Sequence, residues 1–574
     1  MKTLLTIGLS CVAFGGFAQL QQAIKLTDKE QFEHAAKAFE AIVKASPTNG
    51  EAWFYMGENY YANDRTDSAE AAYRKGIDVN SQFPLNYAGL GKVLRGQGKT
   101  AEAQQQFARA TEVATLKTNK YSKQQIAATY REEAEGLLAG SDPDYAAALA
   151  LVEQAIELYP KDPQAYILKG DALFGRNPRD GSAPLENYKK AMELEPQNAE
   201  PLARKAFMYY RANNFTASIE EYNNAIALDP GFAPAWRGRA EAWFKQRDFD
   251  KATADMRKYL ELNSGSTSAR VRNAQFLFLV GKYAESLKEI QALEQEGVQN
   301  IVLLRLKAFN LTEEGRFAEA DSTLQDYFRK QQVGKVIGAD YQYAAKIAQG
   351  LGKAQAQAIQ AGTLATAPVP YDSLAGEQYM KAVSLDHSLD YLYLEAAKAF
   401  TDARVYTKAV DAMRMKVKGP RPEVNDWYYL GAMANRAKMF QTADSAWAQY
   451  ISKQPNIYQG YLYRARAQAG MDTADVKTWA AKPYYEEVIA KMKPEEQGRA
   501  KADLEEAYNY MGLYYLYSST EMDRAKAKCW FMKVAELNAG TSITKQVNEV
   551  FLKMKELKDV VPAQCGAATV EQPK

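Results

Sequence analysis

The chain has 574 residues, a mass of 64.1 kDa and a formal net charge of +2, from 72 Lys and Arg against 70 Asp and Glu. Apolar residues make up 47% and charged residues 25%, which is typical of a folded protein and not of a disordered chain. The near balance of charge argues against nucleic acid as a partner, because such binding rests on an excess of basic residues that neutralise phosphates. Only 2 His and 3 Cys are present, and most enzyme chemistry draws on these residue types. The composition therefore favours a protein that is not an enzyme.

Residues 1–18, MKTLLTIGLSCVAFGGFA, have the pattern of a secretory signal peptide. Lys2 supplies the positive charge, and an apolar run extends over residues 4–17. Gly16 and Ala18 are the small residues at positions −3 and −1 of a cleavage site. The run is too short to cross a bilayer, which takes about 20 apolar residues. No later segment reaches 18 uninterrupted apolar residues, so we expect an exported protein without a stable membrane span.

A lipoprotein signal at Cys11 is the alternative, and two features disfavour it. Gly8 stands three positions before this cysteine, where a lipoprotein signal usually has Leu, and apolar residues continue beyond it. The signal's ending, Phe-Ala-Gln, resembles the signals of Gram-negative, Bacteroidetes-type bacteria. This resemblance implies a periplasmic location without a lipid anchor.

Beyond the signal, small and aromatic residues recur with a period of 34 residues. In the middle of the chain, aromatic residues stand 34 apart at Phe215, Phe249, Tyr283 and Phe317, and small ones at Ala206, Ala240, Ala274 and Ala308. The same spacing appears earlier at Ala35, Ala69 and Ala103, and later at Tyr406 and Phe440. A period shared by several residue classes predicts a tandem repeat.

Each repeat has two helical stretches joined by a short polar turn, such as residues 246–248. The first stretch carries a large residue and then a small one four positions later, as in Trp53 and Gly57. The second carries a small residue and then a large one, as in Ala35 and Phe39, so that the two helices can approach closely. A proline twelve positions after the small residue ends the second helix at Pro47, Pro230 and Pro455.

This pattern resembles the tetratricopeptide repeat (TPR) family, whose units carry Trp, Leu, Gly and Tyr on helix A, Ala, Phe and Ala on helix B, and a closing Pro. The clearest matches are Trp53, Met56, Gly57 and Tyr60 with Ala69 and Tyr73; Trp236, Ala240 and Trp243 with Ala252; and Trp427, Leu430 and Gly431 with Ala443, Trp447 and Pro455. The resemblance covers most of residues 20–540 in about fourteen units. It implies an all-α fold, an α–α superhelix (solenoid) of TPR-like helical hairpins.

The period breaks at about residues 349–378 and again at about 468–500, and such insertions form surface loops that sometimes bind partners. A Lys-rich helical stretch over 543–557 is expected to be the polar cap of the array. The predicted organisation is a signal peptide over 1–18, an N-terminal array over 19–348, an irregular insertion over 349–380, a C-terminal array with its capping helix over 381–560, and a tail over 561–574.

Two cysteines follow the signal, Cys529 and Cys565. An oxidising compartment permits a disulfide between them. However, Cys529 stands in the helical stretch AKAKCWFMKV, where we expect a small packing residue, and Cys565 stands in a polar tail. Packing is the favoured interpretation, and the pairing stays open.

No constellation of residues for catalysis or for a cofactor stands out. His34 is expected on an exposed helix face and His387 near the end of a distant repeat, so a shared metal is not expected. Gly98-Lys99-Thr100 looks like the end of a phosphate-binding loop, but position 93 is Val where that motif needs Gly. We predict no enzyme activity, no cofactor and no metal. The alternative is an enzyme whose site lies within one of the two breaks in the period.

The TPR resemblance implies that helix A lines a concave groove and that residues one and five positions after the Trp-equivalent face it. The predicted groove residues, which include some from the next turn, are mostly aromatic, with scattered Arg: Phe54, Tyr61, Phe174, Phe207, Tyr210, Arg237, Phe244, Phe278, Arg305, Phe309 and Tyr428. Aromatic residues and Arg dominate binding hot spots, and such a groove can hold an extended segment or a helix. The alternative for each aromatic residue is packing between repeats.

A carboxylate clamp of the kind that chaperone-binding TPR domains use is not expected. That clamp takes Lys and Asn, whereas the matching second groove positions are Glu58, Lys92, Asp171, Phe207, Glu241 and Gln275. We predict a non-enzymatic scaffold or adaptor that binds protein or peptide partners of the bacterial cell envelope. The competing hypothesis is a periplasmic protein that binds a small ligand, a glycan or a peptide, because aromatic residues also stack on sugars. Self-association stays open.

Overall fold

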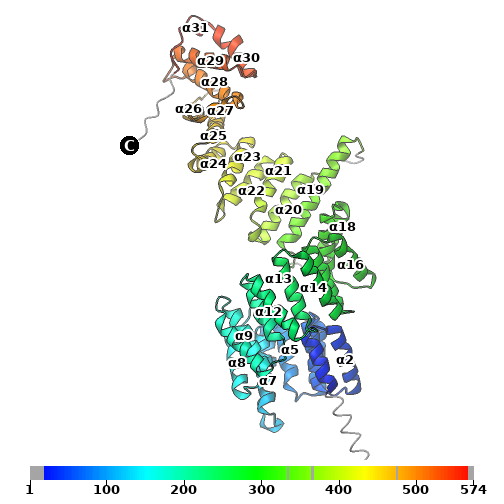
Figure 1. The fold of residues 1–574 in the computed structure, drawn as a ribbon. Helices are drawn as coiled ribbons and strands as arrows, with labels where there is room; N and C mark the ends of the chain where they lie inside the picture. Colours follow the sequence, from blue (N-terminus) through cyan, green and yellow to red (C-terminus); the bar gives the residue numbers. More distant parts are fainter. Residues whose placement is uncertain (1–17, 332–334, 364–367, 474–475, 566–574) are drawn as a thin grey trace, which may run out of the picture. The chain divides into compact units, whose positions relative to one another are not determined.

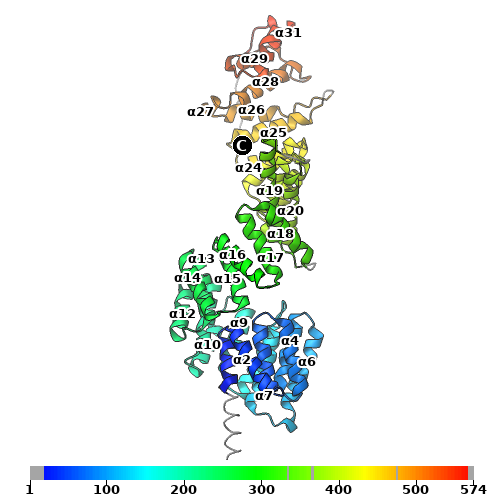
Figure 2. The same ribbon diagram turned by 90° about the vertical axis from the view of Figure 1, so that its right-hand side faces the viewer.

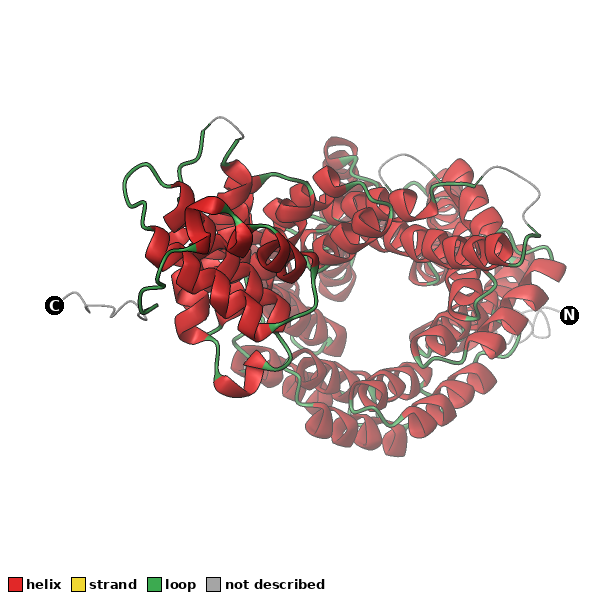
Figure 3. Cartoon of the chain, turned by 90° about the horizontal axis from the view of Figure 1, so that it is seen from above, coloured by secondary structure: helices red, strands yellow, loops and turns green. Residues whose placement is uncertain are grey.

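The computed structural model describes residues 18–331, 335–363, 368–473 and 476–565. The predicted signal peptide therefore lies outside the described residues except for Ala18, and so does most of the predicted tail. All regular secondary structure in the described part is helical, and no strand is present there (Figures 1 and 3). The chain is divided between Gln299 and Asn300 into two compact units.

The N-terminal unit begins with a helix over residues 18–28. It continues with α2 (Phe32–Ala45), α3 (Gly50–Ala62), α4 (Thr66–Val79), α5 (Pro84–Gly96), α6 (Thr100–Thr115), the 3₁₀ turn η1 (Lys117–Asn119), α7 (Lys123–Leu137), α8 (Tyr145–Leu158), α9 (Pro163–Arg176), α10 (Ser182–Leu194), α11 (Glu200–Arg211), α12 (Phe215–Leu228), α13 (Ala233–Lys245), α14 (Phe249–Leu262), α15 (Thr267–Leu279) and α16 (Tyr283–Gln295). Each odd-numbered helix from α3 to α15 packs against the helix that follows it, as helix A and helix B of one hairpin.

The C-terminal unit contains α17 (Ile301–Glu313), α18 (Phe317–Lys330), α19 (Gly338–Gln360), α20 (Tyr371–Leu385), η2 (His387–Leu389), α21 (Leu392–Asp402), α22 (Tyr406–Lys418), α23 (Val424–Arg436), α24 (Phe440–Lys453), α25 (Tyr458–Met471), α26 (Lys482–Lys491), α27 (Pro494–Gln497), α28 (Lys501–Tyr517), α29 (Arg524–Leu537), α30 (Ser542–Glu549), η3 (Phe551–Lys553) and α31 (Lys555–Lys558). Within each unit, successive hairpins stack side by side in chain order (Figure 2). The predicted all-α solenoid of helical hairpins is confirmed.

The turn between helix A and helix B adopts the same backbone conformation in repeat after repeat. In most of these turns one residue has a positive φ, and such residues stand 34 apart at Glu30, Asp64 and Gly98, at Asn213, Arg247, Gly281 and Gly315, and at Arg404 and Lys438. The left-handed conformation costs a non-glycine residue about 1 kcal/mol, so it persists only where the two flanking helices enforce it. The 34-residue period of the sequence is thus also a period of the backbone conformation. It places Gly98-Lys99-Thr100 in an ordinary turn between α5 and α6.

Small residues on helix A make room for aromatic rings on helix B. A Cβ added at Gly57 on α3 would collide with the ring of Tyr73 on α4, and one at Gly89 on α5 would lie 2.5 Å from the same ring. Tyr73 therefore fills the space between one hairpin and the next. Gly431 has the same relation to Trp447. This explains the alternation of large and small residues in the sequence.

In several repeats the residue at the Trp-equivalent position ties helix A to the end of the preceding helix B. The Trp53 Nε1–H donates to the carbonyl of Pro47 at 3.0 Å, and the Trp236 Nε1–H donates to the carbonyl of Pro230 at 3.0 Å. The Tyr461 hydroxyl does the same to Pro455 at 3.0 Å. These rings are therefore structural parts of the repeat.

The first break in the 34-residue period arises from an unusually long helix. α19 is 23 residues long, where most helices of the array have 13 or 14, and it packs along α20. Residues 349–360 and 371–380, which we expected to be irregular, are therefore helical. The Gln355 side chain holds the connection by donating to the carbonyl of Val369 at 2.9 Å and accepting from its N–H at 2.8 Å. The division between the two units lies at residue 299, ahead of the boundary that we expected at 348.

The expected capping helix over 543–557 is broken into α30, η3 and α31. It buries Val547, Phe551 and Leu557, and Phe551 stacks on Phe531 with 4.8 Å between ring centroids. Contrary to the favoured packing interpretation, Cys529 forms a disulfide with Cys565. The reason is that the chain turns back along α29, where the Ala563 N–H donates to the carbonyl of Ala525 at 3.2 Å.

None of the described helices has both the length and the apolar character needed to cross a bilayer.

Candidate functional site

A cavity of about 580 Å³ lies within the N-terminal unit. Five A-position helices line it: the helix over 18–28, α3, α7, α9 and α11. Its apolar wall is formed by Ile24, Phe54, Tyr55, Leu138, Ile167 and Leu168. Six carboxylates and two guanidinium groups line the rest: Asp28, Glu58, Glu132, Glu135, Asp171 and Glu200, with Arg131 and Arg204. The cavity therefore combines an apolar surface with an excess of acidic groups.

The carboxylates of Glu58, Glu132 and Glu135 surround the ammonium group of Lys92, which projects from α5 and is 1% exposed. Lys92 Nζ lies 2.6 Å from Glu58 Oε2, 2.6 Å from Glu132 Oε1 and 3.3 Å from Glu135 Oε1. Ligand oxygens of these three residues lie within 4.8 Å of one another, a separation that suits a divalent cation. The ammonium group already occupies their centre, so the cluster holds α3, α5 and α7 together by an internal ion pair network.

Two carboxyl groups of the cavity have strongly raised pKa values. Burial, together with the Glu58 carboxylate, raises the pKa of Glu132 to about 8, although Lys92 works in the opposite direction. Desolvation by the surrounding protein, together with Glu200 and Glu195, raises the pKa of Asp28 to about 7. These raised pKa values reflect burial first and the repulsion between neighbouring carboxylates second. A cation that entered the cavity would favour the ionised form of both groups.

The two arginines of the cavity are already paired with carboxylates, and those paired with Arg204 line the cavity. Arg131 Nη1 lies 2.5 Å from Asp162 Oδ2. Arg204 lies 3.0 Å from Glu200 and 3.5 Å from Asp171. Within the described part of the chain, the Asp28 carboxylate has neither a hydrogen bond nor an ion pair, and its residue is exposed. Asp28 is therefore the acidic group of the cavity that is available to a ligand.

Of the predicted groove residues, Phe54 lines this cavity; it is 3% exposed and packs against Tyr55 and Tyr73. The ring of Tyr61 lies 4.9 Å from Lys92 Nζ, and Phe174 packs on a core cluster that includes Tyr188. Of these three rings, only that of Tyr61 contacts the ion cluster around Lys92.

The remaining predicted residues of the N-terminal unit lie further along the array. Phe207, 40% exposed, stacks on Tyr210 with 6.3 Å between ring centroids. Phe244 packs against Phe249 and Phe276, and Phe278 packs against Tyr283. Arg237 pairs with Glu30.

The predicted residues of the C-terminal unit all have partners inside that unit. Arg305 Nε lies 2.8 Å from Asp340 Oδ1. Phe309 is buried and stacks on Tyr343 with 3.8 Å between ring centroids. Tyr428 packs edge-on against Trp447 at 5.4 Å. The proposed binding role of these residues stays a prediction. His34 and His387 are both exposed, as expected for His34.

The acidic side of the cavity was missed at the sequence level. Arg131, Glu132 and Glu135 come from α7, whose sequence KQQIAATYREEAEGL lacks the Trp and the helix-A spacing that mark the other repeats. A signal was nevertheless present, because Glu58, Lys92 and Asp171 stand at equivalent positions of their repeats and are all charged.

A family model described as the tetratricopeptide repeat matches residues 20–82, 133–199 and 208–267. Among curated proteins, anaphase-promoting complex subunit 3 of Schizosaccharomyces pombe is 26% identical over 186 residues, which are 32% of this chain and 26% of that protein. The match thus spans about a quarter of the length of that relative.

Three solved structures illustrate the structural similarity. The C-terminal part of a TPR repeat-containing protein from Cytophaga hutchinsonii is 28% identical, with 50% of this chain and 100% of that chain covered and a TM-score of 0.34. A tetratricopeptide repeat protein from Parabacteroides merdae is 21% identical, with 44% and 92% covered and a TM-score of 0.33. Yeast Tom70 is 13% identical, with 75% and 97% covered and a TM-score of 0.37.

Proposed function

Because this chain carries tetratricopeptide repeats, we propose that it is a non-enzymatic binding protein that holds a segment of a partner protein in the cavity of its N-terminal unit. Proteins built from these repeats generally mediate protein–protein interactions and are generally not enzymes. The cavity supports the proposal because it is concave, lined by helix A of successive repeats, and wide enough for several side chains of a bound segment.

The chemistry of the wall indicates which segment fits. Leu168 and Ile167 offer apolar contact, while Asp28 offers a carboxyl group that has no ion-pair partner in the described part of the chain. A segment with Lys or Arg beside apolar residues complements both features. The cavity is preformed by the packing of its helices, so little ordering of the receptor opposes binding.

A pair of labelled peptides tests this proposal. We would measure, by fluorescence anisotropy on the full chain, the binding of a short fluorescein-labelled Lys/Leu peptide and of the same peptide with Glu in place of Lys. The Lys/Leu peptide is expected to bind more tightly. Asp28→Asn is expected to weaken its binding about three- to tenfold, because it removes a charge without removing a structural contact. Lys75→Ala, on the exposed face of α4, is the matched control and is expected to leave the affinity unchanged.

Equal binding of the two peptides would contradict the role of the acidic wall. Binding that is unaffected by Asp28→Asn would place the peptide outside the cavity. No binding of either peptide would contradict the proposed class of ligand.

We also propose that the protein acts after export, in the periplasm of a Gram-negative bacterium, as a scaffold or adaptor of the cell envelope. The support is the signal pattern of residues 1–18. Fusion of alkaline phosphatase to residues 1–30 tests it, since that enzyme is active only after export. Inactive fusions would contradict the proposed location.

The alternative function, a periplasmic receptor for a glycan, has one supporting observation. Phe207 is 40% exposed and stacks on Tyr210, and a flat aromatic platform of this kind suits the apolar face of a sugar. Calorimetry with a panel of saccharides distinguishes the two functions. A saccharide that binds the parent chain but not Phe207→Ala would favour the glycan receptor.

A further inference from the structure

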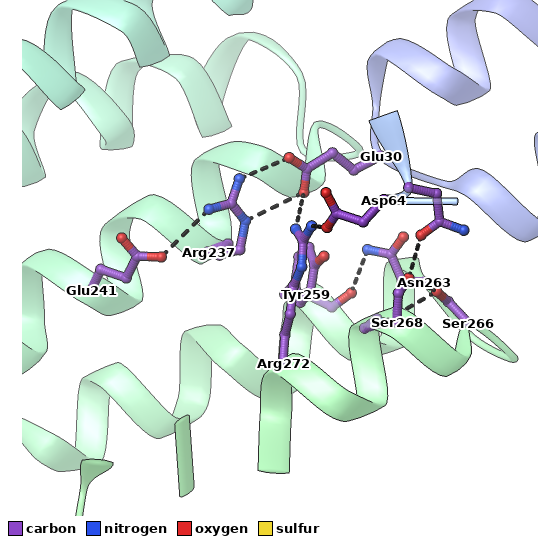
Figure 4. A network of polar contacts seen from close by, with 11 residues as sticks. Glu30, Asp64, Arg237, Glu241, Tyr259, Asn263, Ser266, Ser268 and Arg272 are labelled. Atoms are coloured by element: carbon purple, nitrogen blue, oxygen red, sulfur yellow. Dashed lines mark hydrogen bonds and ion pairs between the residues drawn. The ribbon is translucent and has the colours of Figure 1, made fainter. Parts of the chain in front are cut away.

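The N-terminal unit closes on itself through polar contacts between residues about 200 positions apart (Figure 4). The Glu30 carboxylate accepts hydrogen bonds from Arg237 Nη2 at 2.7 Å and from Arg237 Nε at 3.3 Å. Arg272 lies 3.8 Å from Glu30 and 3.4 Å from Asp64. The first two repeats are thereby joined to α13 and α15.

Further polar contacts extend this junction on both sides. Lys29 Nζ lies 2.8 Å from Asp229 Oδ2, and the Ser268 hydroxyl donates to Asn63 Oδ1 at 2.5 Å. The Gln31 side-chain amide donates to the carbonyl of Gly231 at 3.4 Å. We call these contacts between residues 29–64 and residues 229–272 the seam.

The repeat itself places the two acidic residues of the seam. Glu30 and Asp64 occupy the left-handed turn position of the first and second repeats, 34 residues apart, with φ of 56° and 60°. Their side chains therefore project from successive turns toward Arg272 of α15, and Glu30 also reaches Arg237 of α13 (Figure 4). Although burial opposes ionisation, Arg237 and Arg272 hold the pKa of Glu30 below its ordinary value.

The seam is polar where other junctions in the unit are apolar. One buried apolar cluster extends over residues 20–173, and two others extend over 199–235 and 233–276. In the described part of the chain, none of these clusters includes residues from both sides of the seam. Ion pairs that are partly exposed contribute about 0–1 kcal/mol each and weaken with salt, so the seam is far weaker than a stacked hairpin contact.

The seam lies beside the cavity. Ile24, Thr27 and Asp28, just before the seam in sequence, line the cavity on one side, and α11, the helix-A neighbour of α13, lines it on the other. The polar contacts of the seam join residues 29–64 to α13 and α15, so the closed seam blocks that side of the ring to an internal segment of a long polypeptide. With the seam open, residues 18–64 move away from α13 and α15 and the cavity becomes accessible from the side.

We propose that the seam is an electrostatic gate, which opens and closes reversibly and admits a partner segment sideways into the cavity. The gate goes beyond the proposed binding function, because it gives the seam contacts, which do not touch the ligand, a role in a conformational change. Two states of the N-terminal unit follow from it, closed and open, whose ratio depends on ionic strength.

Distances between spin labels across the seam test the gate without any ligand. Labels at Asp67→Cys and Ser264→Cys, two exposed positions that flank the seam, would be measured by double electron–electron resonance on the full chain. Cys529 and Cys565 are paired with each other and take up no label, and Cys11 would be replaced by Ser. We expect a short distance at low salt and a second, longer population that grows about fivefold in 0.5 M salt, as screening of roughly two ion pairs predicts.

Variants that lack the acidic charges of the seam distinguish opening of the seam from other effects of salt on the distance between the labels. Glu30→Gln with Asp64→Asn is expected to give the longer population already at low salt. Glu193→Gln, which removes one partner of an exposed pair with Lys190 at 3.0 Å, is the matched control and is expected to leave the distances unchanged. A single short distance in every sample would overturn the gate, because the ring would then be permanently closed. A single long distance at low salt would overturn the seam itself.

Discussion

At the scale of single residues, burial of charge is the dominant feature of the N-terminal unit, and Glu133 is its simplest case. Its side chain on α7 is buried, and both carboxylate oxygens accept a hydrogen bond from the Thr111 hydroxyl, at 2.8 and 3.0 Å. Burial raises the pKa of Glu133 from 4.5 to about 7, although the bonds from Thr111 work in the opposite direction. Folding therefore binds a proton between these two values, and this carboxyl makes the protein less stable as the pH rises from 4.5 to 7.

Glu133→Gln is expected to stabilise the protein at pH 8 and to have little effect at pH 4.5. The amide keeps an oxygen that accepts from Thr111 and carries no charge to desolvate. We expect a gain of about 1–3 kcal/mol in the free energy of unfolding at pH 8, measured by urea denaturation. An equal effect at both pH values would contradict the raised pKa. Glu193→Gln, at an exposed carboxylate, is the control for removal of charge alone.

At the scale of the helical elements, the repeat is held by rings that fill spaces left by small residues. Tyr73 projects from α4 into the space between Gly57 of α3 and Gly89 of α5, so that one ring links two hairpins. Its hydroxyl donates to Glu58, which also binds Lys92. The packing of helices and the ion cluster of the cavity therefore depend on the same aromatic residue.

Gly57→Ala is expected to destabilise the protein by about 1–3 kcal/mol, because the new methyl group collides with a ring that has no room to move. Gly96→Ala is the matched control, since a Cβ there meets only the Tyr61 hydroxyl at 3.8 Å. That control is expected to be neutral or to stabilise the helix slightly. The melting temperatures of both variants, measured by thermal unfolding, test these expected changes in stability. Equal melting temperatures would contradict the tight approach of α3 to Tyr73.

The helical elements and their period could be predicted from the sequence, because each repeat encodes its own hairpin. The pattern of Trp53, Gly57 and Tyr73 specifies which helices pair and where they turn. The acidic cavity could not be predicted in full. Glu132 and Glu135 lie on α7, which lacks the Trp and the residue spacing that mark helix A in the other repeats. The predicted aromatic groove includes Phe54 at the cavity, while Phe309 is buried within the other unit.

At the scale of the whole molecule, the chain divides into two units. The ring of helices that the seam closes lies within the N-terminal unit. Closure depends on small rotations that accumulate from hairpin to hairpin, so no single repeat encodes it. Glu30 and Arg237 are 207 positions apart, and nothing in the local pattern of either predicts that they pair. The same reasoning applies to Cys529 and Cys565, which meet because the end of the chain turns back along α29.

The measurement that most directly tests binding in the cavity is site-specific photocrosslinking in cells with the full chain. A benzophenone amino acid would replace Tyr55, which lines the cavity, or Lys75, which lies on the exposed face of α4. We predict that the Tyr55 position crosslinks to a defined partner through a segment with Lys or Arg, and that Asp28→Asn reduces this product. Crosslinking of the same partner from Lys75, with none from Tyr55, would contradict it.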